Sequence, residues 1–283
     1  GRSGADRKTF DICDSQQVRA WIADWKPTQI YHLAAVHGSS EAPTEDAADL
    51  FAQSLKVHAV GLANLLEGVR AEAPKARLVF AASSRVFGLP VESPQDENTS
   101  MAPISPYGIS KAAGIGICSH YRSQYGIHAS SAILYNHESP RRSPGYVTQK
   151  IVRAGVAIKR RQQYRLVLGN LAARVDWAHA ADHIRALRLI ADVSSPGNFI
   201  VASGELNSVR DFGTHVFDCL GLDFDAYVDE DPSLIRSLEP PAELVGNSEK
   251  LRRMTGWEPR FTLKKLARDM VDAELARTAS DSS

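Results

Sequence analysis

The sequence of 283 residues has no excess of charge of either sign, few cysteines and no long apolar run. Lys plus Arg number 33 and Asp plus Glu number 33, so the formal net charge is zero. This balance gives no electrostatic reason for nucleic acid or an anionic membrane surface as the main partner. No stretch approaches the roughly 18 to 20 apolar residues of a membrane span, and residues 1–8 do not resemble a signal peptide. We therefore expect a soluble protein.

The three cysteines, Cys13, Cys118 and Cys219, are far apart and form no CxxC pair. An odd number at these spacings argues against a disulfide framework and against a structural zinc site. The expected compartment is the cytoplasm, and no metal site is predicted.

Short β-branched and aromatic runs alternate with amphipathic stretches of helix length, which is typical of a parallel sheet covered by helices. The predicted fold class is therefore α/β, a doubly wound parallel sheet. Strands are expected at 29–35, 78–82, 128–134 and 198–202, and helices at 46–70, 107–125, 148–161, 178–192, 208–220 and 263–275.

One part of such a sheet is not recognisable in the sequence. A doubly wound nucleotide domain opens with a strand, a Gly-rich turn and a helix whose N-terminus holds the pyrophosphate. The run 1–4 has no strand before it and is too short to form that unit. We expect the opening unit to belong to the natural protein, because a sheet without its first strand would expose a long unpaired edge or a central gap.

Tyr107 and Lys111 stand four residues apart in an expected helix, so their side chains share one face. An ammonium beside a phenol favours the phenolate and lowers its pKa, which lets a tyrosine act as acid or base near neutral pH. The same spacing recurs at Tyr146 and Lys150, so an ordinary helix-surface pair is the alternative interpretation.

The context of Tyr107 separates these alternatives. Ser83 and Ser84 follow the expected strand 78–82, and Tyr107 lies at the start of the next expected helix. Because ligands bind at the carboxyl ends of parallel strands, the serine hydroxyls should face the same crevice as Tyr107. Pro106 fixes the entry to that helix. Tyr107 is therefore the catalytic candidate.

Several runs of the sequence carry a resemblance to a known family. The motifs HLAA at 32–35, SSRVFG at 83–88 and SPYGISK at 105–111 together resemble extended short-chain dehydrogenases/reductases. Within that group, the chain closely resembles GDP-mannose 4,6-dehydratases. The motifs are NHESPRR at 136–142, VTQK at 147–150, LGNL at 168–171 and DWAH at 176–179.

The resemblance implies a Rossmann domain that binds NADP(H) at 1–135 and 175–203, and a smaller lobe for a nucleotide sugar, a GDP-sugar, at 136–174 and 204–283. In such enzymes the tyrosine takes a proton from a sugar hydroxyl while the nicotinamide accepts hydride from the same carbon. Carried over to this sequence, Tyr107 is the base. Lys111 lowers its pKa and holds a ribose hydroxyl, and Ser83 hydrogen-bonds the sugar oxygen.

The resemblance also implies cofactor-binding residues. Arg2 and Ser3 would grip the ribose 2′-phosphate, which favours NADP over NAD, although Arg2 could instead be a solvated terminal charge. Asp11 and Ile12 would flank the adenine. The remaining cofactor-binding candidates follow the first expected strand: Leu33, Ala34 and Ala35.

Ten residues are implied for the substrate. Each charged one could also be a surface ion pair, which is the commoner role of an isolated Arg or Glu. The substrate-binding candidates are Ser84, Arg85, Asn136, Glu138, Val147, Lys150, Asn170, Arg174, Arg210 and Glu239.

The chain departs from the family pattern at Arg85, where dehydratases of this kind carry the glutamate that removes the C5 proton. An arginine stays protonated and cannot serve as that base. Glu138 is the nearest carboxylate candidate to replace it. Val175 and Phe87 stand where an arginine and a tyrosine are usual, and the adjacent Arg174 could compensate for Val175.

Three functions therefore stay open. The first is a dehydratase-type enzyme, and the second is an NADP-dependent reductase or epimerase of a GDP-4-keto-sugar that lacks the elimination step. The third is a non-catalytic binding homologue. By analogy with extended members of the family, a homodimer or dimer of dimers is expected, paired through the helices at 46–70 and 107–125.

Overall fold

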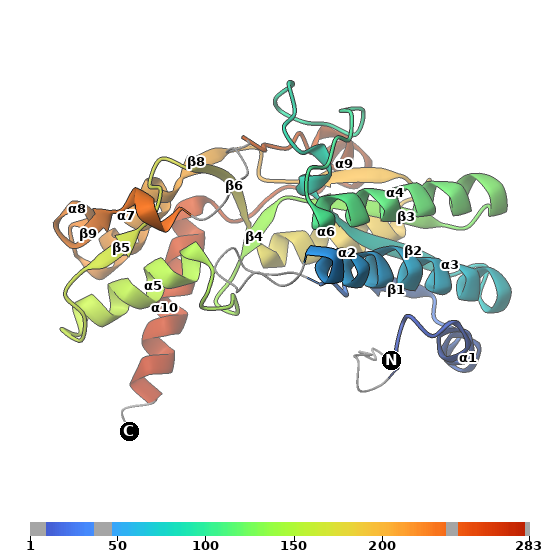
Figure 1. Ribbon diagram of the computed structural model, residues 1–283, viewed down its shortest axis with the longest axis horizontal. Helices are drawn as coiled ribbons and strands as arrows, with labels where there is room; N and C mark the ends of the chain where they lie inside the picture. Colours follow the sequence, from blue (N-terminus) through green and yellow to red (C-terminus); the bar gives the residue numbers. More distant parts are fainter. Residues whose placement is uncertain (1–9, 37–46, 236–242, 281–283) are drawn as a thin grey trace.

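The computed structural model describes residues 10–36, 47–235 and 243–280, and within them a four-stranded parallel sheet has the order β1-β2-β3-β7 (Figure 1). Arg2, Ser3 and Glu239, which the sequence predicts as ligand-binding residues, lie outside the described residues. The strands are β1 (Gln29–His32), β2 (Arg77–Ser83), β3 (Ala129–Leu134) and β7 (Asn198–Val201). Each strand coincides with a predicted one to within a few residues.

Helices cover both faces of this sheet, because side chains of a strand alternate between its faces. On β2, Leu78 and Phe80 pack with α1, α3 and α4, whereas Val79 packs against α6 and Trp257 on the other face. The sheet is thus doubly wound, and the predicted fold class is confirmed. The covering helices are α1 (Ser15–Trp25), α2 (Ala47–Leu55), α3 (Gly61–Glu72), α4 (Pro106–Tyr125), α6 (Ala180–Asp192) and α9 (Glu249–Thr255).

A π-helical turn at Lys56–Val60 joins α2 to α3 without a break, since both flanking residues keep right-handed helical angles. Together the three segments form the single long helix that the sequence predicts at 46–70. α4 lies beside this helix on the same face of the sheet (Figure 1).

A second hydrophobic core lies at the end of the molecule away from α3 and α4 (Figure 1). It is built by α5 (Val147–Lys159), α7 (Val209–Leu220) and α10 (Leu263–Ser280), with the pair of strands β5 (Leu166–Leu168) and β9 (Val228–Glu230) and the short α8 (Phe224–Tyr227). A sheet of β4 (Asn136–Glu138), β6 (Arg174–His179) and β8 (Leu206–Ser208) lies between the two cores. Short 3₁₀ turns are η2 (Ser84–Phe87) and η3 (Pro232–Leu234).

A buried carboxylate on β6 holds two loops at this junction. Asp176 accepts hydrogen bonds from the backbone N–H of Ser203, of Gly204 and of Gly246, at 2.9, 3.0 and 3.2 Å. Burial raises the pKa of Asp176, while the bonds that it accepts from Ser203 and the two glycines act in the opposite direction. The segment after β7 and the segment before α9 are thereby fixed to β6.

Candidate active site

The start of α4 places Tyr107 beside the carboxyl end of β2. Ser105 caps the helix by accepting the N–H of Gly108 at 3.2 Å, and Pro106 occupies the first turn. A Cβ on Gly108 would lie 2.6 Å from the carbonyl oxygen of Arg85, so only a glycine lets the helix approach η2 this closely. The first turn of α4 therefore packs directly on the residues that follow β2.

Ser83 ends β2, and its side chain is hydrogen-bonded to that of Tyr107. This is the juxtaposition that the sequence predicts for a serine at the carboxyl end of a strand and a tyrosine at the start of the next helix. Burial raises the pKa of Tyr107, and the hydrogen bond from Ser83 counteracts part of that rise. The two oxygens are thus placed to hold one substrate oxygen between them.

Lys111 lies one turn further along α4 and is 1% exposed. Its Nζ donates to the carbonyl oxygen of Ala81 at 2.7 Å and lies 5.6 Å from the ring centroid of Tyr107. Burial lowers the pKa of Lys111 to about 7. The predicted effect of Lys111 on the phenol is wrong for this structure, because desolvation dominates and the pKa of Tyr107 goes up.

The predicted cofactor residues follow β1 and precede α1. Leu33, Ala34 and Ala35 are exposed at the carboxyl edge of the sheet. Ile12 packs against Gly61, where a Cβ would lie 2.8 Å from its side chain, and its carbonyl oxygen accepts from Asn64 at 3.0 Å. The carboxylate of Asp11 accepts the N–H of Cys13 at 2.9 Å. The exposed apolar side chains of Leu33, Ala34 and Ala35 fit a dinucleotide that lies along this edge.

Arg85 lies on η2 with an exposed side chain, two residues beyond Ser83, and the side chain of Ser84 between them is buried. Phe87, which stands where the family usually has a tyrosine, is fully packed in the core beneath the sheet. An arginine therefore occupies the turn next to the Ser83 and Tyr107 pair, as the sequence indicates.

Glu138, the alternative carboxylate, is buried in β4 and already has two partners. Thr148 donates its hydroxyl to the carboxylate at 2.8 Å, and Nε of Arg142 lies 3.1 Å from it. Burial raises the pKa of Glu138, whereas the Arg142 charge and the Thr148 hydrogen bond oppose that rise. The Arg142 guanidinium lies 3.5 Å over the ring of Tyr146. Glu138 thus anchors Arg142 and Tyr146 rather than standing ready to accept a proton.

Those of the predicted phosphate and nucleoside ligands that lie among the described residues are in the second core region, and each has a local partner. Arg174 lies 3.3 Å from a carboxylate oxygen of Glu243, and Arg210 pairs with Asp225. Asn170 accepts the N–H groups of 172 and 173, both at 2.9 Å, and so holds its own turn. β6 and β8 pair Arg174 with Ser208, two residues before Arg210. These residues are therefore neighbours in the lobe, although they are far apart in the sequence from one another and from Tyr107.

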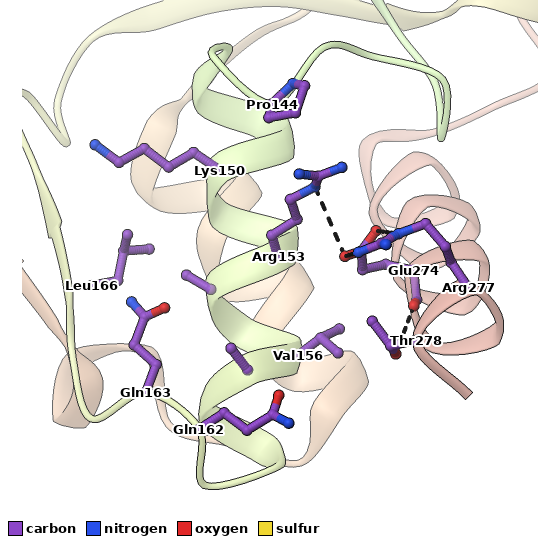
Figure 2. Close-up of a pocket in the computed structure, with 12 residues that line it drawn as sticks. Pro144, Lys150, Arg153, Val156, Gln162, Gln163, Leu166, Glu274, Arg277 and Thr278 are labelled. Atoms are coloured by element: carbon purple, nitrogen blue, oxygen red, sulfur yellow. Dashed lines mark hydrogen bonds and ion pairs between the residues drawn. The ribbon is translucent and has the colours of Figure 1, made fainter. Parts of the chain in front are cut away.

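A groove of about 430 Å³ lies between α5, the segment before β5 and α10. Figure 2 shows the residues that line it. Lys150 and Arg153 of α5 contribute to its wall, and Arg153 points toward Glu274 of α10. Val147 begins α5, and Asn136 is exposed at the start of β4. Tyr107 and Ser83 do not line this groove, so Lys150 is its one contributor from the predicted site among the described residues.

Sequence reasoning missed one buried residue next to Tyr107. The ring of His58 lies edge-on to that of Tyr107, with centroids 5.4 Å apart. A single histidine within a helical stretch carries no signal of such a contact, because its position depends on the π-helical turn. Among the described residues, no group of His, Cys, Asp and Glu could hold a metal ion.

A doubly wound parallel sheet with Ser, Tyr and Lys meeting at the carboxyl end of β2 defines an extended short-chain dehydrogenase/reductase. The sequence profile of the GDP-mannose 4,6 dehydratase family matches residues 6–270, and the chain belongs to that family.

Curated relatives agree with this assignment over most of their length. The chain is 35% identical to GDP-mannose 4,6 dehydratase 2 of Caenorhabditis elegans, covering 96% of this chain and 74% of the relative. It is 38% identical to GDP-mannose 4,6 dehydratase 2 of Arabidopsis thaliana, covering 94% of this chain and 70% of the relative.

Solved structures show the same fold. RMD from Pseudomonas aeruginosa, complexed with NADPH, superposes with a TM-score of 0.83 at 22% identity, covering 95% of this chain and 88% of that one. A putative epimerase from Burkholderia cenocepacia gives a TM-score of 0.79 at 25% identity, covering 98% of this chain and 87% of that one. Among the described residues, no helix is both long and apolar enough for a membrane span.

Proposed function

We propose that this chain is an NADP(H)-dependent enzyme that acts on C4 of a GDP-sugar. The arrangement that carries the proposal is the hydrogen-bonded pair of Ser83 and Tyr107 above the buried Lys111. The relatives named above, which are GDP-mannose 4,6 dehydratases by name, support the substrate class.

In the oxidative direction the Tyr107 phenolate takes the proton of the C4 hydroxyl, and Ser83 donates a hydrogen bond to the same oxygen. The bound nicotinamide supplies the acceptor for the hydride that leaves C4. In the reductive direction the Tyr107 phenol returns the proton to the C4 carbonyl oxygen. With the cofactor bound, Lys111 would exchange the Ala81 carbonyl for a ribose hydroxyl and so orient the nicotinamide toward Tyr107.

The residues from 136 to 174 and from 204 to 283 hold the nucleotide sugar in this proposal, and those from 1 to 135 and from 175 to 203 hold the cofactor. Arg174 and Arg210 are the candidate diphosphate ligands, because a guanidinium fork matches phosphate geometry. Both lie exposed and paired with exposed carboxylates, from which a diphosphate could displace them. Leu251 and Trp257 belong to the range 204–283 but pack under the main sheet. The segment around α9 therefore supports the sheet that holds the cofactor in this proposal.

A reductase or epimerase is the second candidate, and Arg85 favours it. Oxidation or reduction at C4 needs only Ser83, Tyr107, Lys111 and the cofactor, whereas removal of the C5 proton needs a base close to the sugar. Arg85 occupies the turn where a dehydratase has that base, and Glu138 is held by Arg142 and Thr148. A 4-keto-sugar substrate would suit this site without any elimination.

We also propose a homodimer or dimer of dimers in the cytoplasm. The predicted pairing helices leave apolar or small residues outward: Val60 is half exposed, and a Cβ on Gly116 would meet no atom within 4 Å. The cysteines form no disulfide, which fits a reducing compartment. Light scattering coupled to gel filtration tests the assembly, and a monomer at micromolar concentration would contradict it.

The decisive experiment identifies the product. The protein is incubated with GDP-mannose, and separately with its 4-keto-6-deoxy derivative, in the presence of NADP(H), and products are read by mass spectrometry. Loss of water from GDP-mannose supports a dehydratase, and gain of two hydrogens by the keto sugar supports a reductase. A protein that shows no NADPH binding in a fluorescence titration would instead be the non-catalytic homologue.

Arg85→Glu sharpens the choice. Restoring a carboxylate two residues after Ser83 is expected to create or raise water elimination from GDP-mannose, because a base then faces the sugar. Arg85→Gln, which removes the charge without supplying a base, is the matched control. Identical product profiles for the two variants would show that this position does not limit the elimination.

A further inference from the structure

His58 lies in the π-helical turn Lys56–Val60 and is fully buried. π-Helical turns are rare inside α-helices and are frequent at functional sites. A Cβ on Gly114 of α4 would lie 3.2 Å from the carbonyl oxygen of His58, so this glycine lets α4 press against the turn. The turn and the close approach together direct the imidazole between β1 and the first turns of α4.

The two ring nitrogens of His58 contact two different parts of the site. Nε2 accepts the backbone N–H of Val36 at 3.0 Å, directly after the exposed segment Leu33 to Ala35. Nδ1 lies 2.8 Å from Oγ of Ser110, and that hydroxyl donates to the carbonyl oxygen of Tyr107 at 2.8 Å. A chain of hydrogen bonds therefore runs from the end of the cofactor segment to the backbone of Tyr107.

The direction of each bond follows from the donors. A backbone N–H can only donate, so Nε2 of His58 carries no proton, and the neutral ring has its proton on Nδ1. Nδ1 then donates to Ser110, which directs its own hydroxyl proton toward the Tyr107 carbonyl. One neutral tautomer satisfies every group, and a protonated ring would break the bond to Val36.

We propose that His58 is a positioning residue that couples the cofactor segment after β1 to the orientation of Tyr107, with Ser110 as the link. The proposal rests on the proposed function, since it presumes that Leu33 to Ala35 contact the cofactor and that Tyr107 is the base. In this coupling, the contact with Val36 positions the segment that binds the cofactor, and the contact with Ser110 positions the phenol of Tyr107.

Two isosteric substitutions separate the contacts. His58→Gln keeps an acceptor near the position of Nε2 and loses the Ser110 contact, whereas His58→Asn keeps a donor near Nδ1 and loses the Val36 contact. We expect His58→Gln and Ser110→Ala to lower kcat by about tenfold or more, with a smaller change in KM for NADP(H). We expect His58→Asn to raise the Kd for NADPH, measured by fluorescence titration, and to lower kcat less than His58→Gln does.

His128→Gln is the matched control, because Nε2 of His128 also contacts a backbone group, here the carbonyl oxygen of Val193 at 2.9 Å, away from Tyr107. This variant should lower the thermal midpoint, and it should not change kcat more than the Kd for NADPH or the reverse. If both His58 variants change kcat and Kd in parallel, in proportion to their loss of thermal stability, His58 is a packing residue and the coupling is refuted.

A readout without turnover keeps this test apart from the proposed function. The Tyr107 phenol, labelled with ¹³C at Cζ, is titrated by NMR in the protein without substrate. His58→Gln and Ser110→Ala should raise its titration midpoint, because a misaligned ring loses the hydrogen bond from Ser83, and His58→Asn should move it less. If the protein shows this pattern but is inactive on GDP-sugars, the coupling to Tyr107 stands and the proposed function is wrong. Equal midpoints in all variants would refute the coupling.

Discussion

The sheet side and the lobe side of the candidate site are built in opposite ways. On the sheet side, Tyr107, Lys111 and His58 are buried or nearly so, and each polar atom is held by a backbone group or a serine. On the lobe side, Arg174 and Arg210 are about half exposed and paired with exposed carboxylates. Exposed ion pairs of this kind contribute little to stability.

This difference separates chemistry from binding. A proton-transfer group must be placed to within a fraction of an ångström, so its neighbours are fixed before a ligand arrives. A diphosphate ligand needs cations that can exchange one anionic partner for another at low cost. Substitutions on the sheet side should therefore act on kcat and on stability, and substitutions on the lobe side on KM.

The largest expected effect comes from Tyr107→Phe. Without the hydroxyl no proton can be moved at the C4 oxygen, and kcat should fall by about a hundredfold to ten-thousandfold. Binding of the nucleotide sugar, measured by calorimetry, should stay close to that of the parent. Tyr164→Phe removes an equivalent hydroxyl from an exposed position and serves as control. Equal rates in Tyr107→Phe and the parent would end the assignment.

Lys111→Met tests burial on the sheet side through pH. The pKa of Lys111 is about 7 in the folded protein, whereas that of an ordinary lysine side chain is 10.5, so between these values the unfolded chain binds one proton more. Stability of the cofactor-free parent should then rise with pH in this window, by about 1.4 kcal/mol per pH unit from this group.

Lys111→Met should remove that slope in urea unfolding measured at several values between pH 7 and pH 10. Lys75→Met, at an exposed turn, should leave the slope unchanged. A slope that survives in Lys111→Met would mean that the lysine keeps its proton in the folded state.

A smaller effect is expected on the lobe side. Arg210→Gln removes a charged hydrogen-bond donor and should raise KM for the nucleotide sugar by about tenfold, with a smaller change in kcat. Asp225→Asn removes the competing carboxylate and should lower KM by a few fold. If Arg210→Gln changes kcat and leaves KM alone, the division between the two sides is wrong.

The main sheet could be predicted because its strands are continuous apolar runs. Leu78 to Ala82 are all buried, and the helix after them begins with a serine cap and a proline. By contrast, α1, in which Val18 and Ile22 are the buried residues, is not among the helices expected from the sequence. The three-residue strands of the lobe are too short to show a periodicity.

The residues of the candidate site could be predicted from the sequence, but their burial, their hydrogen-bond partners and the resulting pKa shifts could not. Spacing places Lys111 one turn from Tyr107, yet it does not show that desolvation raises the phenol's pKa and lowers that of the lysine. Likewise, a motif containing Glu138 does not show that Arg142 and Thr148 hold its carboxylate. Burial depends on contacts between distant parts of the chain, and these are set by the whole fold.

The carboxylate of Asp176 has a consequence for how the neighbouring loops can change. Its three backbone bonds depend on amide hydrogens and not on the side chains that follow β7 or precede α9. Two of the three bonded positions also need glycine for their backbone, because Gly204 has a φ of +83° and a Cβ on Gly246 would lie 2.5 Å from that of Ala202. Substitutions that adapt these loops to another sugar would therefore have to fall outside the two glycines.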